Sequence, residues 1–343
     1  MFLIQALLLL LHTTFIASAS LKSVLSSHPS LSILNSLLQQ FDLLDSFDSY
    51  QNITLIAPTD DAYRALAQWG FNVSLVEPFI ARALLRYHVL DGTFPTLAVP
   101  ETDPKVVQTF LQPPVLTNVT RGAGVKILRT SPGSGSRIVT ESGLQVIGGV
   151  EEADIAFDEG IIHTLNSSMV LPHNISTTAA VANLTEFLQL MDDADMVSIL
   201  EELKDATLFV PWNGALEKAR PLLRFLEPEQ LASVLKYHAI PNKVLYGEAL
   251  AKGGKISVKS LQGATLQINA DSAGELYVNN AKVVRRDLMI YGGVAHIVED
   301  ILVPEAKETA SDSFSAPELP IYDTSSKLRF QMPKSPWTPP LLW

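Results

Sequence analysis

Hydrophobic residues recur at three- and four-residue steps in two stretches of the chain, one in each half. In the first stretch they are Leu34, Leu37, Leu38, Phe41 and Leu44. In the second stretch they are Val181, Leu184, Phe187, Leu188 and Met191. Because this spacing gathers apolar side chains on one face of a helix, each stretch predicts an amphipathic helix whose apolar face lies in a core.

A short apolar run follows the first of these helices. Residues 54–57 read TLIA, which favours a buried strand, and Pro58 is expected to end it because proline has no backbone N–H for a sheet. The hydroxyl of Thr59 can accept a bond from the first turn of a helix, and Asp60 adds negative charge at the positive end of the helix dipole. A helix is therefore predicted to begin here, and Asn213 is expected to cap the corresponding helix of the second half.

Alternating apolar and polar residues, separated by glycine turns, predict further strands in the second half. These strands are 255–258, 265–269, 276–278 and 282–284. Because the helices come first and the strands follow, the pattern favours an α+β fold over a doubly wound α/β fold.

Three landmarks recur in the same order in both halves. TLIAPTDDAY (54–63) and TLFVPWNGAL (207–216) lie 153 positions apart, each is followed by a Tyr-His pair, and the halves close with GIIHTLNSSMVLP (160–172) and GVAHIVEDILVP (293–304). The recurring residues are Pro58, Tyr87, His88 and His163 in the first half and Pro211, Tyr237, His238, His296 and Pro304 in the second. Self-similarity at domain length predicts two related domains.

These landmarks resemble the fasciclin-like domain family, which has a Thr-x-Phe-Ala-Pro-Thr-Asp-x-Ala-Phe block, a central Tyr-His pair and a closing Gly-Val-x-His-x-Ile-Asp-x-Val-Leu-x-Pro block. The resemblance covers residues 21–304 and implies, in each half, a β-wedge or sandwich flanked by helices. It adds Thr59 and Asp60 to the signature of the fold. The first half departs from the closing block, because Asn166-Ser167-Ser168 stands where the family has its aspartate.

The chain divides into four predicted segments. Residues 1–19 read as a secretory signal peptide, with an apolar run from Ala6 to Leu11 and small residues at Ala17 and Ala19, although a short uncleaved anchor is the alternative. Residues 20–172 and 173–304 are the two predicted domains. Residues 305–343 are polar and proline-bearing, and they are expected to form a disordered tail.

Composition excludes several classes of function. The chain has no cysteine, so disulfides, thiolate metal sites and cysteine nucleophiles are excluded. A formal net charge of −11 would repel phosphate backbones, so nucleic acid is not an expected partner. After the N-terminal run, no apolar stretch approaches the ~20 residues that cross a bilayer, so no transmembrane span is expected.

Four of the seven histidines form corresponding pairs, His88 with His238 and His163 with His296. One interpretation is a metal site or a general base. Apolar neighbours and the lack of an HExxH motif or a carboxylate cluster favour the other, in which each buried imidazole satisfies groups of the fold. Neither a Gly-x-Ser-x-Gly elbow nor a phosphate-binding glycine loop occurs, so no catalytic residue, cofactor or metal is expected.

Two kinds of surface site are predicted. The resemblance implies a receptor contact at an acidic-apolar dipeptide before the closing block, where Asp154-Ile155 and Asp287-Leu288 stand, although such dipeptides also fit an ordinary strand edge. Glycosylation sequons occur at Asn52, Asn72, Asn118, Asn166, Asn174 and Asn183. Glycans at these positions would shield the first half and leave most of the second bare.

Together these patterns predict a secreted, non-catalytic glycoprotein that acts as an adhesion, extracellular-matrix or cell-surface interaction module with protein or glycan partners. One alternative is a protein of the vacuole or another secretory lumen that aids membrane trafficking. Another is a carbohydrate-active or hydrolytic enzyme, which would need two convergent carboxylates in a pocket. Within the resemblance, the lack of cysteine-rich modules and of a lipid-anchor tail makes some animal and plant members of the family poor matches, so a fungal source is expected. No pattern indicates an oligomeric state.

Overall fold

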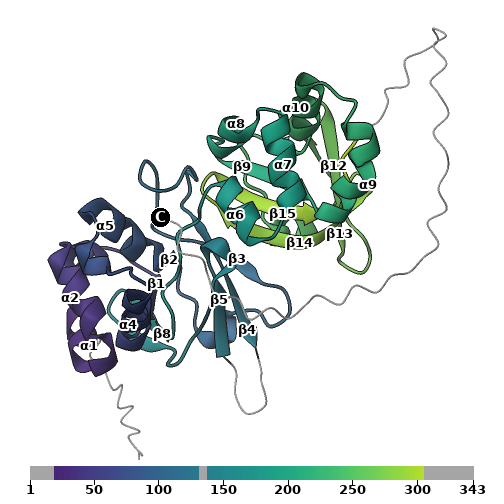
Figure 1. Ribbon diagram of the computed structural model, residues 1–343. Helices are drawn as coiled ribbons and strands as arrows, with labels where there is room; N and C mark the ends of the chain where they lie inside the picture. The colour runs from purple at the N-terminus through teal and green to yellow at the C-terminus, as the bar shows by residue number, and fades with distance from the viewer. Residues whose placement is uncertain (1–18, 131–136, 305–343) are drawn as a thin grey trace, which may run out of the picture. The chain divides into compact units, whose positions relative to one another are not determined.

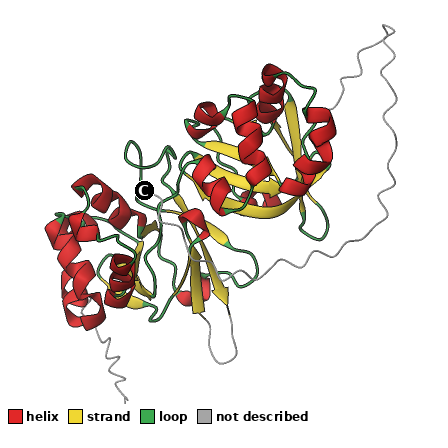
Figure 2. Ribbon diagram, viewed as in Figure 1, coloured by secondary structure: helices red, strands yellow, loops and turns green. Residues whose placement is uncertain are grey.

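The computed structural model describes residues 19–130 and 137–304. The predicted signal peptide, apart from Ala19, and the predicted C-terminal tail lie outside these residues. The described parts of both halves belong to one compact unit that ends at Pro304. Figure 1 shows the order of the elements along the chain, and in Figure 2 helices and strands are distinguished by colour.

The first half begins with helices and contains two sheets. Its helices are α1 (Leu21–Ser27), α2 (Ser32–Gln40), α3 (Leu44–Asp48), α4 (Asp60–Gln68) and α5 (Pro78–Tyr87). One sheet has the order β2-β1-β8-β7 and consists of β2 (Val89–Asp91), β1 (Ile53–Pro58), β8 (Gly160–Leu165) and β7 (Ile155–Phe157). The other has the order β3-β4-β5-β6 and consists of β3 (Lys105–Gln108), β4 (Gly124–Thr130), β5 (Arg137–Glu141) and β6 (Ile147–Gly149). Strands β1 and β8 run parallel, so the opening and closing blocks of the repeat are paired with each other.

The second half repeats this plan with one larger sheet. Its helices are α6 (Ile175–Val181), α7 (Thr185–Asp193), α8 (Val197–Glu201), α9 (Asn213–Leu223), α10 (Pro228–Tyr237) and α11 (Gly247–Lys252). Its seven strands have the order β10-β9-β15-β14-β13-β12-β11. They are β9 (Ala206–Pro211), β10 (Ala239–Ile240), β11 (Ile256–Lys259), β12 (Thr265–Ala270), β13 (Leu276–Val278), β14 (Ala281–Ile290) and β15 (Gly293–Val298). The α+β fold predicted from the sequence is confirmed.

Each predicted amphipathic stretch divides into two parts rather than forming one helix. In the first half α2 ends before Asp42, whose φ is 55°, and the N–H of Leu43 donates to the carbonyl of Leu38 at 2.9 Å. In the second half α6 and α7 are separated at Asn183, whose φ is 57°. Aspartate and asparagine tolerate this left-handed conformation, which turns the chain while the apolar side chains on both sides stay in the core.

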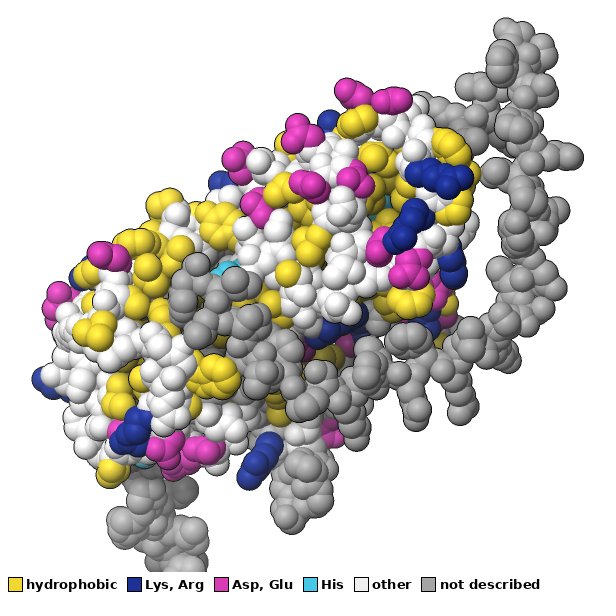
Figure 3. All heavy atoms as spheres, viewed as in Figure 1, with side chains coloured by type: hydrophobic (Ala, Val, Ile, Leu, Met, Phe, Trp, Pro, Cys, Tyr) yellow, Lys and Arg dark blue, Asp and Glu magenta, His cyan; other side chains and the backbone are white. Residues whose placement is uncertain are grey.

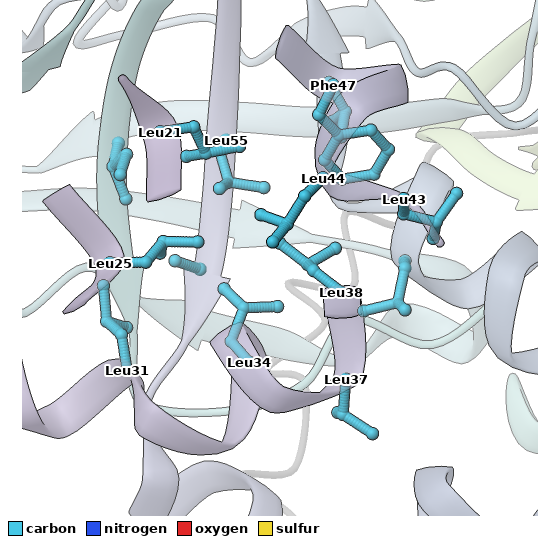
Figure 4. Close-up of a cluster of buried hydrophobic side chains, with 14 of the residues drawn as sticks. Leu21, Leu25, Leu31, Leu34, Leu37, Leu38, Leu43, Leu44, Phe47 and Leu55 are labelled. Atoms are coloured by element: carbon cyan, nitrogen blue, oxygen red, sulfur yellow. The ribbon is translucent and has the colours of Figure 1, made fainter. Parts of the chain in front are cut away.

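The core of each half forms on both sides of its central strands. In the first half, leucines from α1 and α2 and Phe47 of α3 pack against Leu55 of β1 (Figure 4). A second cluster, which includes Ile56 of β1 and Val125 of β4, lies between the two sheets. The corresponding clusters of the second half include Leu208 and Phe209 of β9. The strand that opens each repeat is therefore buried on both faces.

The polar residues that follow this strand cap two different helices. Thr59 accepts from the N–H of Ala62 at 3.4 Å, so it caps α4 as predicted. Asp60 lies in the first turn of α4 as predicted, and its carboxylate also accepts from the hydroxyl of Ser32 at 2.6 Å, at the start of α2. Asn213 likewise accepts from the N–H of Glu186 at 3.2 Å in α7, and it makes no cap for its own helix. The expectation that Asn213 caps its own helix was wrong, because Asn213 is the first residue inside α9, Trp212 is its N-cap, and the side-chain oxygen of Asn213 accepts from α7.

We expect each half to fold cooperatively when expressed alone, because each has its own core on both sides of its central strands. Urea unfolding of fragments 20–172 and 176–304 tests this. Lower stability than in the full chain is expected because contacts between the halves are lost. The idea fails if neither fragment shows a cooperative transition while the full chain does.

A second prediction concerns the glycines that begin β8 and β15. A Cβ at Gly160 would lie 1.9 Å from the carbonyl oxygen of Ile53, and one at Gly293 would lie 1.9 Å from that of Ala206. Because both obstacles are backbone atoms of the paired strand, Gly160→Ala or Gly293→Ala should destabilise the protein by about 3 kcal/mol. Gly149→Ala, whose new methyl would meet nothing closer than 3.4 Å, is the control. Equal melting temperatures for all three variants would contradict the prediction.

Candidate functional site

In each half the Tyr-His pair stands at the end of the second helix after the opening strand, α5 or α10. The hydroxyl of Tyr87, at the end of α5, donates to the carbonyl of Gly124 at 2.8 Å, at the start of β4. The hydroxyl of Tyr237, at the end of α10, donates to the carbonyl of Thr265 at 3.0 Å, at the start of β12. Each tyrosine therefore ties its helix to the hairpin that carries the outer sheet.

The histidine of each pair ties the same helix to the closing segment. In His88, Nδ1 donates to the carbonyl of Leu84 at 2.8 Å and Nε2 accepts from the N–H of Met169 at 3.0 Å. In His238, Nδ1 donates to the carbonyl of Val234 at 2.8 Å, and Nε2 accepts from the N–H of Leu302 at 2.9 Å. These partners specify a neutral imidazole with its proton on Nδ1.

The second histidine pair uses the opposite tautomer. In His163, Nδ1 accepts from the N–H of Asp154 at 3.1 Å and Nε2 donates to the carbonyl of Phe94 at 2.9 Å. In His296, Nδ1 accepts from the N–H of Asp287 at 3.3 Å and Nε2 donates to the carbonyl of Leu245 at 2.8 Å. In all four imidazoles, both ring nitrogens are therefore hydrogen-bonded to backbone groups.

The two aspartates fix the same loop from the other side. Asp154 and Asp287 have φ values of 60° and 61°, a conformation in which their N–H groups reach the histidines. The carboxylate of Asp154 accepts from the N–H of Thr96 at 2.9 Å, and that of Asp287 accepts from the N–H of Gly247 at 2.8 Å. Aspartate is suited to this position because it tolerates positive φ and carries an acceptor.

Two threonines that the sequence analysis treated only as strand residues complete the arrangement. Thr54 donates to the carbonyl of Gly92 at 2.8 Å and accepts from the N–H of Phe94 at 2.9 Å. Thr207 makes the same two bonds, to Lys243 and Leu245, both at 2.8 Å. The sequence did contain a signal for this role, because Thr54 and Thr207 each begin an otherwise apolar block in the two copies of the repeat.

Burial controls the charge of these histidines. Desolvation is the largest influence in all four, and it lowers the pKa of His88 and of His238 to about 4. It also lowers the pKa of His163 and of His296, although the nearby Asp154 and Asp287 carboxylates act in the opposite direction. Neutral imidazoles match the hydrogen bonds described above, since each ring needs one nitrogen as an acceptor.

The paired histidines of the repeat are all held by hydrogen bonds within the fold. Both nitrogens of each paired histidine are engaged, and the four rings are at most 3% exposed. Among residues 19–130 and 137–304, no group of three histidine or acidic side chains has the geometry of a metal site. The geometry therefore supports the second interpretation of the histidines, as side chains that satisfy groups of the fold.

The two predicted contact dipeptides differ in accessibility. Asp154 is exposed and Ile155 is half-buried. Asp287 and Leu288 are only 4% and 2% exposed. Any contact at this position of the repeat is therefore confined to the first half, and the receptor contact itself stays a prediction.

The six sequons also differ in their surroundings. Asn52, Asn72, Asn166 and Asn183 are exposed, whereas Asn118 and Asn174 are half-buried. Asn174 caps α6 by accepting from the N–H of Thr177 at 2.9 Å. The N–H of Asn118 donates to the carbonyl of Tyr291 at 2.8 Å, so this sequon lies where the two halves meet. Occupancy of the sequons stays a prediction.

Apolar side chains are exposed on both halves among polar ones, as Figure 3 shows for one face. They include Leu75 of the first half, 81% exposed, and Leu222 and Phe225 of the second, 64% and 72% exposed. Leu222 lines a hollow of about 210 Å³ between α9, α10 and the closing segment. Val234, Tyr237 and Val303 also line it, so its wall is apolar and offers little to orient a polar substrate.

We predict that stability falls as the pH drops from about 6.5 toward 4. A lowered pKa in the folded state contributes stability that is complete above the unfolded value and is lost through this range, by about 3 kcal/mol for each of His88 and His238. Urea unfolding at several pH values measures it. His238→Ala should lower stability at pH 7 by about 1 to 3 kcal/mol and flatten the pH dependence. A slope unchanged in His238→Ala would contradict this role.

In the part of the chain that the structure describes, no helix combines the length and the hydrophobicity needed to cross a lipid bilayer. The sequence model of the fasciclin domain matches residues 29–172 and 182–304. The chain is 50% identical over 293 residues to the fasciclin-like arabinogalactan protein elcF of Phaeosphaeria nodorum, covering 85% of this chain and 91% of that protein. It is 44% identical over 299 residues to the fasciclin-like arabinogalactan protein CTB11 of Cercospora beticola, covering 87% and 79%.

Among solved structures, the FAS1 domain pair of the insect cell adhesion molecule Fasciclin I matches 80% of this chain and 97% of that chain, with a TM-score of 0.40 and 17% identity. The resemblance to the fasciclin domain family therefore extends well beyond short motifs. The family model covers both halves, and the two fungal relatives align over most of their length. The chain belongs to the fasciclin domain family, as a tandem pair of fasciclin domains.

Proposed function

We propose that this protein is a secreted, non-catalytic glycoprotein that acts as an adhesion or extracellular-matrix module and binds protein or glycan partners at the cell surface. The observation that carries the proposal is the use of the repeated polar residues. Histidines, tyrosines, threonines and aspartates that recur in both halves are bonded to the backbone of their own half. These repeated residues therefore stabilise the fold, and we expect partners to bind the surface residues between them.

The composition of the surface supports an extracellular interaction role. The net charge of −11 favours solubility and disfavours nucleic acid and anionic membranes. Four of the six sequons have an exposed asparagine, which is the condition for carrying a glycan in the folded protein. The two fungal relatives are named arabinogalactan proteins, which supports a glycosylated protein of the same kind here.

The sequons also indicate which surface is free for partners. Asn52, Asn72 and Asn166 belong to the first half, and Asn183 stands at the opening of the second. No sequon follows it up to residue 343. Glycans would therefore limit access to the first half near these positions, while most of the second half stays bare.

The proposal predicts both the destination and the modification of the protein. Expressed with its own N-terminal segment in a filamentous fungus, the chain should be found in the medium or the cell wall, starting near Ser20 and carrying glycans at Asn52 and Asn72. N-terminal sequencing and glycopeptide mass spectrometry measure this. Retention inside the cells with all six asparagines unmodified would overturn it.

Binding is tested by attachment of cells to surfaces coated with the purified protein. If the exposed Asp154-Ile155 dipeptide contacts a receptor, Asp154→Asn/Ile155→Ser should reduce attachment at least ~10-fold, because truncating a central contact commonly costs this much. Asp158→Asn, at a nearby exposed position, is the matched control. Equal attachment to the variant and the control would remove this dipeptide from the proposal.

A further inference from the structure

The two halves contact each other through a basic face of the second half and an acidic face of the first. Arg286 lies 3.0 Å from Asp103, and Arg285 lies 3.5 Å from Glu141. Both arginines belong to the irregular middle of β14, where the pairing with β15 shifts register. We name residues 284–289 of β14 the bulge face, and we name the outer surface of β3, β4 and β5 the hairpin face.

This contact has an apolar centre as well as its ion pairs. Val106 of the hairpin face clusters with Met289 and Val294 of the second half. Beside them, Lys126 lies 2.6 Å from Glu141 and its side chain is only 9% exposed. The contact between the halves therefore shows how a bulge face binds a hairpin face. Complementary charges surround a small apolar contact.

Because the halves are repeats, the first half has a bulge face of its own. Asp154 and Asp287 occupy equivalent positions, since each has positive φ and donates its N–H to the paired histidine. Counting back from them, Glu152 stands where the second half has Arg285. Glu151, Glu152 and Asp154 are exposed, and none of them pairs with a cation among the described residues. The bulge face of the first half is therefore acidic and uncovered.

The second half likewise has a hairpin face of its own. The hydroxyls of Tyr87 and Tyr237 bond to the first residues of β4 and β12, which makes Gln267 the counterpart of Lys126. Gln267 pairs with Ser257 on β11, in the row that corresponds to Val106 in the first half.

Lys255 and Lys259 flank Ser257 on this hairpin face. Both are exposed, and neither pairs with a carboxylate in the described part of the chain. The hairpin face of the second half is therefore basic and uncovered.

The two uncovered faces therefore have charges opposite to those of the two faces that bind each other inside the chain. Inside the chain a basic bulge face binds an acidic hairpin face, and the uncovered pair consists of an acidic bulge face and a basic hairpin face. We propose that a second copy of this chain is the partner, with the bulge face of one first half bound to the hairpin face of another second half. The apolar contact would come from Leu97, which is 84% exposed and follows Thr96, the residue whose N–H bonds to Asp154.

Such a contact joins two different faces, so two joined copies keep one free bulge face and one free hairpin face between them. Contacts of this kind are heterologous, and they extend head to tail unless the rotation between copies closes a ring. The inference goes beyond the proposed function, because association of the purified protein does not depend on its destination in the cell. A self-associating chain is nevertheless suited to a matrix.

The test is the molar mass of the glycan-free, full-length protein by sedimentation equilibrium over a range of concentration and salt. We expect the mass to rise beyond two chains with concentration at low salt, and the association constant to fall at least ~10-fold in 0.5 M NaCl because the contact depends on opposite charges. Glu151→Lys/Glu152→Lys and Lys255→Glu/Lys259→Glu should each be monomeric under the same conditions. An equimolar mixture of these two variants should associate again, because every contact in an alternating chain then joins opposite charges.

Asp192→Lys/Asp193→Lys is the matched control, since it changes two exposed acidic residues of α7 away from both faces. It should associate like the unmodified protein, and thermal melts should show that all variants are folded. The proposal is overturned if the unmodified protein stays monomeric at low salt. It is also overturned if the mass stops at two chains, if either reversed variant still associates alone, or if their mixture does not associate.

Discussion

Four buried, neutral imidazoles hold this structure together, because each one joins two backbone groups that the regular sheets and helices leave unpaired. His88 and His238 connect the end of a helix to the closing segment, and His163 and His296 connect the last strand to the loop that follows that helix. A neutral imidazole is suited to this because it is at once a donor and an acceptor across a rigid ring. If one of these bonds were not made, a buried polar group would have no partner, and this would cost more free energy than the bond itself contributes.

This arrangement separates the scaffold from the surface. The parallel pairing of the opening and closing strands brings the signature residues together in the interior, where they bond to their own half. Variation is then possible outside them, as the two copies illustrate. The second half continues as one long strand, β14, through the position at which the first half is interrupted between β6 and β7. In this region one copy carries Arg285 and Arg286 and the other carries Glu151 and Glu152, so the same architecture presents opposite charges.

Much of the fold was predictable because it depends on periodicity and on local stereochemistry. The apolar stripes predicted core-facing helices, the TLIA and TLFV runs predicted buried strands, and Thr59 capped its helix as expected. The breaks in the helices were not predicted. Asp42 and Asn183 look like ordinary polar positions of an amphipathic pattern, and their positive φ follows from the way the next segment packs. The bond between Asp60 and Ser32 was not predicted for a related reason, since the two residues are 28 positions apart in the chain.

The sequence by itself determined the number of repeats, the order of their helices and strands, the absence of cysteine chemistry and the residues that matter to the fold. These are properties of composition and of spacing along the chain. Only the tertiary structure decided which atoms these residues bond, why Asp154 is accessible while the equivalent Asp287 is buried, and which faces of the two halves are covered. The physical reason is that a hydrogen bond or an ion pair depends on distances of about 3 Å between residues far apart in sequence, and spacing along the chain carries no record of those distances.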